Sequence, residues 1–242
     1  MLIINGGLPR SGTVLVGNLI RLMLEDQGLP WKRYNPQEPR HLPAFLRVVR
    51  ECSEDCALIV HTHLIDAEIL SAICARDDAV LIWNHRDPRD ALVSLMKLHE
   101  ITLEWALKAM GVYCSAAATA LTTQRCLEVR YTDLVSDLTV QIEMLAQALS
   151  VTLRTEETEA LIERTSAAAH RKVMFALAEG TMPGMSEVPT RNRMLREDPK
   201  TLLNDRHIQS GKNGRWRTEL SAEAQSRVQV ELANWVKRFG YV

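Results

Sequence analysis

Residues 7–13, Gly-Leu-Pro-Arg-Ser-Gly-Thr, combine two glycines, a cation and two hydroxyls, and this composition suits the binding of an anion. The segment follows the apolar run 2–5 and precedes residues 14–24, whose apolar positions recur at helical spacing. Backbone N–H groups and the positive end of a helix converge at such a turn. We therefore expect a phosphate or sulfate here, held by two hydrogen bonds from the Arg10 guanidinium.

This loop differs from the nucleoside-triphosphate loop G-x-x-x-x-G-K-S/T at two positions. Gly7 and Gly12 match, but Thr13 stands in place of the lysine and Val14 in place of the hydroxyl that binds magnesium. These differences disfavour an ATP hydrolase or kinase and favour a donor that is handled without magnesium. The loop alone leaves open a simple tight turn, with Ser11 as the helix N-cap.

A second basic segment, residues 83–94, follows another apolar run. Asp87 suits a helix N-cap, which places Arg86 just before a helix and Ser94 within it. Because ligands of open α/β sheets bind outside the carboxyl ends of the strands, Arg86 and Ser94 are candidates for binding a second phosphate. The alternative is that the arginines of this segment form exposed ion pairs with its aspartates, which would contribute little.

His61 and His63 come directly after the apolar run 57–60. Transfer of a group to a hydroxyl or amine requires a base, and histidine titrates near neutral pH. The histidines at this strand end, His61 and His63, are therefore candidates for such a base. The alternative is a buried, neutral histidine that lines a cavity.

Short apolar runs alternate with segments of helical periodicity over more than half of the chain. The predicted strands are 2–5, 57–60, 79–83 and 126–131, and the predicted helices are 14–24, 44–50, 67–75, 89–99, 103–121, 140–149 and 222–238. This alternation is typical of a parallel sheet covered on both faces. We expect an α/β fold with three layers, α/β/α, around a central parallel sheet.

Two segments lack this pattern. Residues 30–43 are rich in turn-forming residues, so we expect irregular structure there. Residues 180–214 are basic, polar and broken by prolines and glycines. A loop of this length in a compact domain is typical of a functional lid.

Composition limits the possible partners. The chain has 242 residues, 29 Lys+Arg and 30 Asp+Glu, so its net charge of −1 disfavours a nucleic-acid or membrane-surface partner. No apolar run approaches the roughly 18 residues of a spanning helix. The five cysteines form no Cys-x-x-Cys pair, which predicts reduced thiols and no metal site. We expect a single cytoplasmic domain over residues 1–242.

Four segments, in this order along the chain, resemble the sulfotransferase superfamily that uses 3′-phosphoadenosine 5′-phosphosulfate, in particular its short soluble bacterial members. They are the 5′-phosphosulfate loop Pro9-Arg10-Ser11-Gly12-Thr13, the 3′-phosphate segment Arg86-Asp87-Pro88-Arg89-Asp90-Ala91-Leu92-Val93-Ser94, the adenine-side segment Tyr131-Thr132-Asp133-Leu134 and the closing segment Gly211-Lys212-Asn213-Gly214-Arg215-Trp216. In addition, residues 61–64, His-Thr-His-Leu, are similar to the family's Lys-Thr-His-Leu-Pro.

The resemblance implies a P-loop NTPase-like sulfotransferase fold, with residues 180–214 closing over the nucleotide. It implies that His63 is the catalytic base and that Arg10 stabilises the transferred group. The donor would be 3′-phosphoadenosine 5′-phosphosulfate, the product adenosine 3′,5′-bisphosphate, and no metal would be required. The implied donor-binding residues are Pro9, Arg10, Ser11, Gly12, Thr13, Arg86, Ser94, Tyr131, Gly211, Lys212, Asn213 and Gly214.

The sequence departs from the family pattern in two places. Val14 and Leu15 stand where the family often has a second threonine and an aromatic residue, and Gln209-Ser210 replaces a basic pair. Lys212, Arg206 or the basic loop around Arg191 and Arg193 are the candidates to replace that pair.

Aromatic residues make up only 5% of the chain, which favours a small polar acceptor over a phenol. One specific hypothesis, from the resemblance to enzymes of secondary metabolism, is a guanidinium alkaloid of the saxitoxin type. Two other functions remain open, a P-loop small-molecule kinase and a nucleotide-binding protein without catalysis. The sequence does not predict the oligomeric state.

Overall fold

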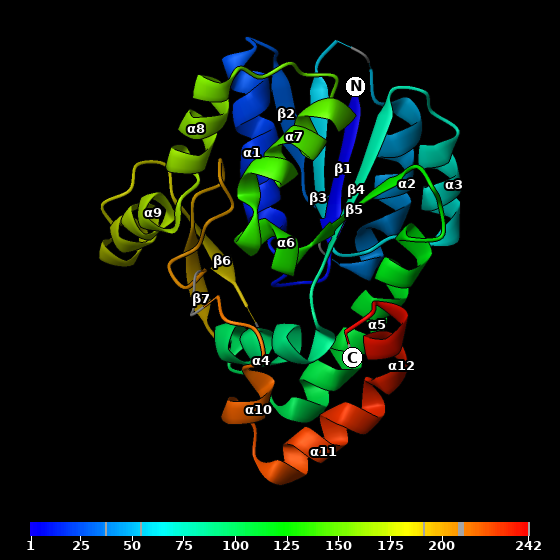
Figure 1. The fold of residues 1–242 in the computed structure, drawn as a ribbon, viewed down its shortest axis with the longest axis vertical. Helices are drawn as coiled ribbons and strands as arrows, with labels where there is room; N and C mark the ends of the chain where they lie inside the picture. Colours follow the sequence, from blue (N-terminus) through cyan, green and yellow to red (C-terminus); the bar gives the residue numbers. More distant parts are fainter. Residues whose placement is uncertain (37, 54, 191, 208–210, 242) are drawn as a thin grey trace. The chain divides into compact units, whose positions relative to one another are not determined.

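A five-stranded parallel sheet is the centre of the computed structural model, which describes residues 1–36, 38–53, 55–190, 192–207 and 211–241. The strand order is β2-β3-β1-β4-β5 (Figure 1). The strands are β1 (Leu2–Gly7), β2 (Trp31–Tyr34), β3 (Ala57–Thr62), β4 (Ala79–His85) and β5 (Cys126–Arg130). The predicted α/β class with a central parallel sheet is confirmed.

The central strand β1 is buried along its whole length. Its apolar side chains, including Ile3 and Ile4, are 0% exposed, as expected for a strand covered on both faces. Gly6 allows the close approach of β4, because a Cβ atom at this position would lie 2.2 Å from the Trp83 ring. The register pairs Leu2 with Leu58 of β3 and with Ala79 of β4.

Helices cover both faces of the sheet. Helix α1 packs against α7 on one face and α2 packs against α3 on the other (Figure 1). The bounds are α1 (Thr13–Asp26), α2 (Leu42–Glu51), α3 (Ala67–Cys74), α6 (Tyr131–Ser136) and α7 (Leu138–Ala148). The three layers therefore agree with the sequence-based expectation.

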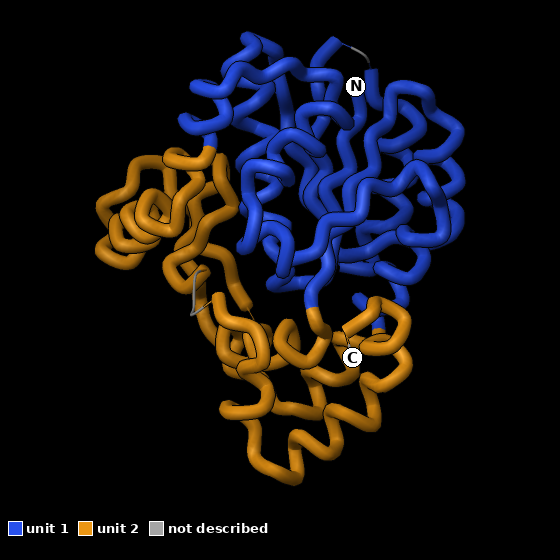
Figure 2. The backbone as a smooth tube through the Cα atoms, viewed as in Figure 1, with its two compact units in different colours: residues 1–86, 112–161 blue, residues 87–111, 162–242 orange. Residues whose placement is uncertain are grey.

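The chain divides into two compact units, each made of two segments (Figure 2). The first unit comprises residues 1–86 and 112–161, and the second comprises 87–111 and 162–242. One boundary lies between Arg86 and Asp87, and the other two fall within α5 (Leu103–Ala120) and α8 (Thr155–Arg164). A single domain over residues 1–242 and a closing role for residues 180–214 stay predictions.

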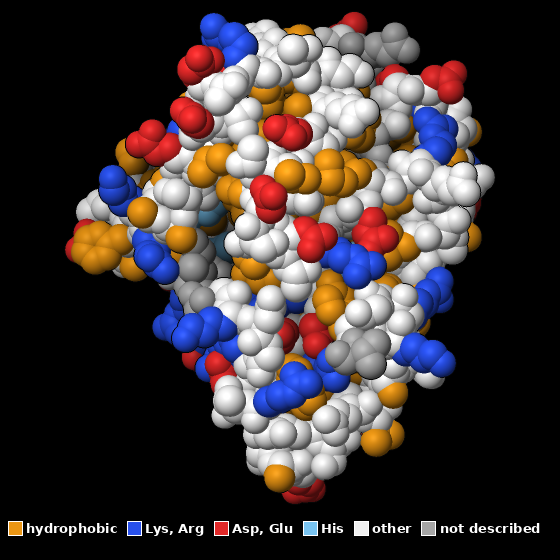
Figure 3. Space-filling view, viewed as in Figure 1, with side chains coloured by type: hydrophobic (Ala, Val, Ile, Leu, Met, Phe, Trp, Pro, Cys, Tyr) orange, Lys and Arg blue, Asp and Glu red, His pale blue; other side chains and the backbone are white. Residues whose placement is uncertain are grey.

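The second unit is mainly helical. Helices α10 and α12 pack against α4, and α9 packs against β7. The bounds are α4 (Pro88–His99), α9 (Ala167–Glu179), β6 (Ser186–Pro189), β7 (Met194–Glu197), α10 (Trp216–Glu219), α11 (Ala222–Glu231) and α12 (Ala233–Arg238). Figure 3 shows Lys and Arg side chains on the surface formed by the hairpin and α10.

Several expectations about local structure are wrong. Residues 30–43, expected to be irregular, contain β2 and the short 3-10 helix η1 (Pro39–His41). The 180–214 segment contains the antiparallel hairpin β6–β7. The predicted final helix is two helices that meet at Leu232. Helices α8 and α9 were not expected.

The structure also bears on chain-wide properties. Within the described residues, no helix is apolar over a length sufficient to cross a membrane. The five cysteines are free thiols, and burial raises the pKa of Cys114 and Cys126 to about 12. No cluster of metal-ligating side chains occurs in the part of the chain that the structure describes.

Candidate active site

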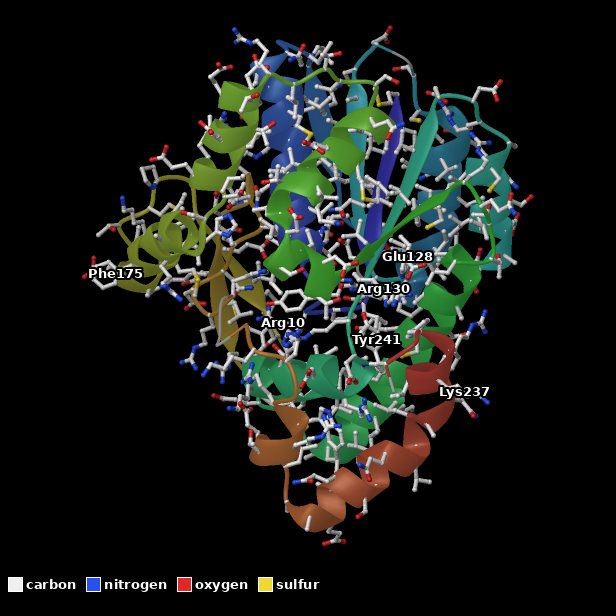
Figure 4. The ribbon with its side chains drawn as sticks, viewed as in Figure 1. Arg10, Glu128, Arg130, Phe175, Lys237 and Tyr241 are labelled. Atoms are coloured by element: carbon white, nitrogen blue, oxygen red, sulfur yellow. The ribbon has the colours of Figure 1, made fainter. Side chains whose placement is uncertain are left out.

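The strand order brings four candidate segments of the first unit to one edge of the sheet. Adjacent strands β3, β1, β4 and β5 are followed by His63, the loop 7–13, Arg86 and Tyr131, respectively. Because the carboxyl ends of parallel strands meet at one edge, these segments are neighbours. Figure 4 shows Arg10 just beyond the carboxyl ends of the strands.

The loop between β1 and α1 has a left-handed backbone at two positions. Arg10 has φ 67°, and Gly12, with φ 91°, is the N-cap of α1. The interpretation of Ser11 as an N-cap is therefore wrong. The Ser11 hydroxyl lies 2.6 Å from the Leu8 carbonyl oxygen and 3.1 Å from that of Asn84, and it donates to these acceptors. Ser11 thus shapes the loop, while the first N–H groups of α1 have no acceptor within the helix.

Two buried asparagines lie behind the loop, and sequence analysis did not identify them. The Asn84 side-chain amide donates to Asn5 Oδ1 at 3.0 Å and to the Gly6 carbonyl at 2.8 Å. The Asn5 amide in turn donates to the Thr13 carbonyl at 2.9 Å. Both side chains are 0% exposed, so their hydrogen bonds form in a low-dielectric interior. This network ties β1, β4 and the start of α1 together.

The imidazole of His63 is held next to the loop. Its Nδ1 lies 2.7 Å from the Gly7 carbonyl oxygen. A carbonyl only accepts, so Nδ1 carries the proton, and in the neutral ring Nε2 is the nitrogen that takes up a proton. The rings of His61 and Tyr113 lie edge-on to His63, with centroids 5.4 Å and 5.9 Å away.

Tyr113 comes from α5, 50 residues along the chain from His63, and no sequence pattern pointed to it. Burial raises the pKa of Tyr113, so its hydroxyl remains protonated at neutral pH. The contact with His63 joins residues that are distant in the sequence, so no local pattern reveals it.

Arg86 is brought against Tyr131. Its guanidinium carbon lies 4.3 Å from the Tyr131 ring centroid, and the residue is 3% exposed. This geometry is a cation–π contact. The same ring approaches the loop 7–13, because a Cβ atom on Gly12 would lie 3.4 Å from Tyr131 Cδ2. Arg86 is therefore not one of the exposed arginines that the alternative interpretation requires. Tyr131, expected at the end of a strand, instead begins α6.

A histidine–carboxylate pair lies on the neighbouring strands. His85 Nε2 is 2.8 Å from Glu128 Oε1, and Glu128 also accepts a hydrogen bond from Arg130 (Figure 4). Burial lowers the pKa of His85, although the Glu128 carboxylate opposes this effect. Because His85 is fully buried and Glu128 is 41% exposed, desolvation of the imidazole dominates. The interaction is therefore a hydrogen bond that the neutral imidazole of His85 donates to the carboxylate of Glu128.

The second unit carries the remaining predicted residues. Ser94 is 3% exposed on α4, whereas Lys212 and Asn213 are exposed. Gly214 donates its backbone N–H to Asp90 Oδ2 at 2.7 Å, a contact that sequence analysis did not predict. Gln209 and Ser210, which replace the family's basic pair, lie outside the described residues, and so does Arg191, one of the candidates to take over the role of that pair.

Within the second unit, Arg89 forms an ion pair with Asp87, with Nη2 2.7 Å from Oδ2. Asp87 also accepts from the Arg89 backbone N–H and caps α4, as predicted. The pair is largely buried rather than exposed. The alternative interpretation of this segment thus named a correct ion pair, Arg89 with Asp87, but expected it to be exposed.

Comparisons with known proteins agree with this architecture. The family model described as a sulfotransferase domain matches residues 2–240. The crystal structure of retinol dehydratase in a complex with retinol and PAP has a TM-score of 0.67 and 16% identity, covering 98% of this chain and 81% of that chain. That of mouse sulfotransferase SULT7A1 complexed with PAP has a TM-score of 0.68 and 14% identity, covering 98% and 84%.

At these identities the structural likeness shows the fold, and it confirms the predicted sulfotransferase fold. A search of the curated proteins gives no match. The family model, however, spans nearly the entire sequence, from the first strand to the last helix. The protein therefore belongs to the sulfotransferase family.

Proposed function

We propose that the protein transfers a sulfuryl group from 3′-phosphoadenosine 5′-phosphosulfate to an oxygen or nitrogen of a small polar acceptor. The observation that carries the proposal is the 2.7 Å contact between His63 Nδ1 and the Gly7 carbonyl. This contact fixes the tautomer of His63 and holds its ring at the start of the loop 7–13, the proposed phosphate loop. The proposed base and the proposed anion-binding turn are thus joined by one hydrogen bond.

In the proposed mechanism, His63 Nε2 accepts the acceptor's proton as the acceptor atom attacks sulfur. A bond forms between the acceptor and sulfur, and the bond between sulfur and the bridging oxygen of the 5′-phosphate breaks. Adenosine 3′,5′-bisphosphate leaves with the bridging oxygen. Arg10 and the N–H groups at the start of α1 stabilise the negative charge that develops there, a contribution expected to exceed that of the base.

The donor's nucleotide is proposed to bind through the residues that the family resemblance implies. Pro9, Ser11, Gly12 and Thr13 form the turn for the 5′-phosphosulfate, with Ser11 contributing through the shape of the loop. Arg86 and Ser94 bind the 3′-phosphate and Tyr131 contacts the adenine side. Gly211, Lys212, Asn213 and Gly214 are proposed to bind the nucleotide as well.

The metal-free reaction and the acceptor are finer proposals. Thr13 and Val14 replace the lysine and the magnesium-binding hydroxyl of a nucleoside-triphosphate loop, which supports transfer without magnesium. The low aromatic content supports a polar acceptor. A guanidinium alkaloid of the saxitoxin type stays a hypothesis, and turnover of neutral alcohols without turnover of guanidinium compounds would contradict it.

Calorimetric titration of the purified protein tests the donor. Adenosine 3′,5′-bisphosphate, adenosine 5′-phosphate and ATP are compared, each with and without magnesium. We expect selective binding of the bisphosphate that does not depend on magnesium. Tight ATP binding that requires magnesium, with no preference for the 3′-phosphate, would favour the kinase alternative.

One variant and one assay then separate binding from chemistry. Arg86→Ala should weaken the bisphosphate far more than adenosine 5′-phosphate, because it removes a guanidinium proposed to bind the 3′-phosphate. Transfer from a labelled donor to a panel of alcohols, amines and guanidines is the assay for turnover. Bisphosphate binding without any transfer to this panel would favour a nucleotide-binding protein that lacks catalysis.

A further inference from the structure

Asp90 is a buried carboxylate of the second unit that none of the proposed catalytic steps uses. It lies in the first turn of α4 and is 1% exposed. A buried charge is unfavourable unless hydrogen bonds compensate for the loss of water. The groups that Asp90 contacts therefore indicate its role. Its Oδ2 accepts the N–H of Gly214 at 2.7 Å, and its Oδ1 accepts the N–H of Trp216 at 3.2 Å.

The ring of Trp216 forms cation–π contacts with two arginines. The guanidinium carbons of Arg89 and Arg217 lie 4.5 Å and 4.4 Å from its ring. Arg89 is itself oriented by Asp87 and by the Tyr241 carbonyl, to which its Nη2 donates at 3.1 Å. Trp216 is 1% exposed, so this end of the 211–216 segment is anchored at the start of α4.

The backbone at Gly214 is adapted to this contact. Its φ is 76°, a left-handed conformation that strains other residues. The glycine turns its N–H towards Asp90, whose position on α4 is four residues before Ser94. Residues four apart lie on one face of a helix, so Asp90 binds the 211–216 segment on the face that carries Ser94.

We propose that Asp90 is a positioning residue for the donor's 3′-phosphate, because it holds the 211–216 segment against the face of α4 that carries Ser94. This inference rests on the proposed function. It names one source of the protein's proposed preference for a 3′-phosphorylated nucleotide. Asp90 acts through the backbone of Gly214 and Trp216 and does not itself contact the nucleotide. Without Asp90, residues 211–216 would have to become ordered when the nucleotide binds, and the free energy of ordering them would weaken binding.

The test is nucleotide discrimination, measured by calorimetry as the ratio of the dissociation constants of adenosine 5′-phosphate and adenosine 3′,5′-bisphosphate. We expect Asp90→Ala to weaken the bisphosphate about tenfold, which corresponds to about 1.4 kcal/mol, and to leave the 5′-phosphate within about twofold. Asp90→Asn should give an intermediate loss, because an amide has one acceptor oxygen instead of two.

Ser221→Ala is the matched control. Ser221 caps α11, the helix that follows α10, and accepts the Ala224 N–H at 3.3 Å. Its loss should lower stability, as the loss of an N-cap does, but leave the discrimination ratio unchanged. Thermal unfolding of all variants identifies any that fail to fold, in which case Asp90→Asn carries the test.

The outcomes distinguish a failure of the proposed function from a failure of the role proposed for Asp90. If the unmodified protein does not distinguish the two nucleotides, the proposed function itself is contradicted. If it does distinguish them and both Asp90 variants keep the full preference, the positioning role of Asp90 is wrong. A graded loss from Asp90→Asn to Asp90→Ala, with the Ser221→Ala ratio unchanged, supports it.

Discussion

The phosphate loop of the first unit and the 211–216 segment of the second both present glycines where an anion is proposed to bind, but they are held differently. Neutral, fully buried groups hold the first, through Ser11, Asn84 and Asn5. Charged groups contribute to holding the second, through the Asp90 carboxylate, two cation–π contacts of Trp216 and the ion pair between Arg215 and Glu219, while Lys212 and Asn213 are exposed.

This difference has a physical consequence. A buried network of neutral hydrogen bonds is specific in geometry, because every broken bond leaves a polar group without water. A segment whose middle residues are exposed opens at a lower cost than a fully buried loop. The loop is thus suited to hold reacting groups in fixed positions, and the 211–216 segment, anchored at Trp216, is suited to adjust its exposed residues to a nucleotide.

The largest expected effect tests the fixed region. His63→Ala should reduce turnover by roughly 10²- to 10⁴-fold, because it removes the base, while the affinity for adenosine 3′,5′-bisphosphate stays unchanged. His63→Asn is the matched variant, since its amide can still donate to the Gly7 carbonyl but cannot act as a base. Steady-state kinetics with a labelled donor provide the measurement, and turnover near that of the unmodified protein in either variant would remove His63 from the mechanism.

Asn84→Ala should break the network behind the loop. It removes two hydrogen bonds and leaves Asn5 Oδ1 buried without its donor, so the free energy of unfolding should fall by about 1 to 3 kcal/mol. Because the loop itself loosens, both nucleotides should bind more weakly by a similar factor. Urea denaturation and calorimetry measure the two effects.

Asn192→Ala is the control for Asn84→Ala, because its amide makes an exposed hydrogen bond to the Glu100 carbonyl. We expect a change in stability within about 0.5 kcal/mol. Equal losses in the two variants would show that the buried network contributes no more than a surface contact.

Gly214→Ala probes the second region. A Cβ atom would meet only Arg217 Nη1, at 3.9 Å, so the strain comes from the backbone, whose φ is 76°. The left-handed conformation should cost about 1 to 2 kcal/mol. We expect weaker binding of the bisphosphate with little change for adenosine 5′-phosphate. If both nucleotides lost affinity equally, the 211–216 segment would not differ from the phosphate loop in the way described above.

The smallest expected effect is a pH dependence of the first unit. Burial lowers the pKa of His85 below the usual 6.5, so the folded state favours the neutral ring. Its contribution to stability is present above about pH 6.5 and is lost as the pH falls from there through the lower folded-state pKa. The free energy of unfolding should therefore decrease between pH 7.5 and about pH 5.5.

His85→Gln should flatten this decrease, because glutamine does not titrate and still offers an amide donor to Glu128. Burial raises the pKa of Glu128, but its hydrogen bonds with His85 and Arg130 outweigh this and lower it below 4.5. Glu128 therefore remains ionised over the chosen range. Urea denaturation at several pH values provides the comparison, and identical slopes for the two proteins would exclude His85 as a contributor.

The sequence predicted the interior of the first unit better than its edge. Strands β1, β3, β4 and β5 are continuous apolar runs, so their burial is evident without any knowledge of their partners. The edge strand β2, Trp-Lys-Arg-Tyr, is only partly buried and follows a proline, which makes it resemble a turn. The hairpin β6–β7 was missed because each of its strands has only four residues and no continuous apolar run.

The site shows a similar limit. The sequence places His63, Arg10, Arg86 and Tyr131 at strand ends, and the strand order then makes them neighbours. Contacts that join distant segments leave no local pattern. Asp90, for example, is 124 residues from Gly214 in the chain.

The central position of β1 also determines when the site can form. Its neighbours β3 and β4 come much later in the chain, and Ser11 is 73 residues from its acceptor Asn84. Pairing between such distant segments folds slowly, because loop closure must precede the favourable contacts. The phosphate loop therefore acquires its shape only once β4 has joined the sheet, and a nascent chain that ends before Asn84 lacks this acceptor.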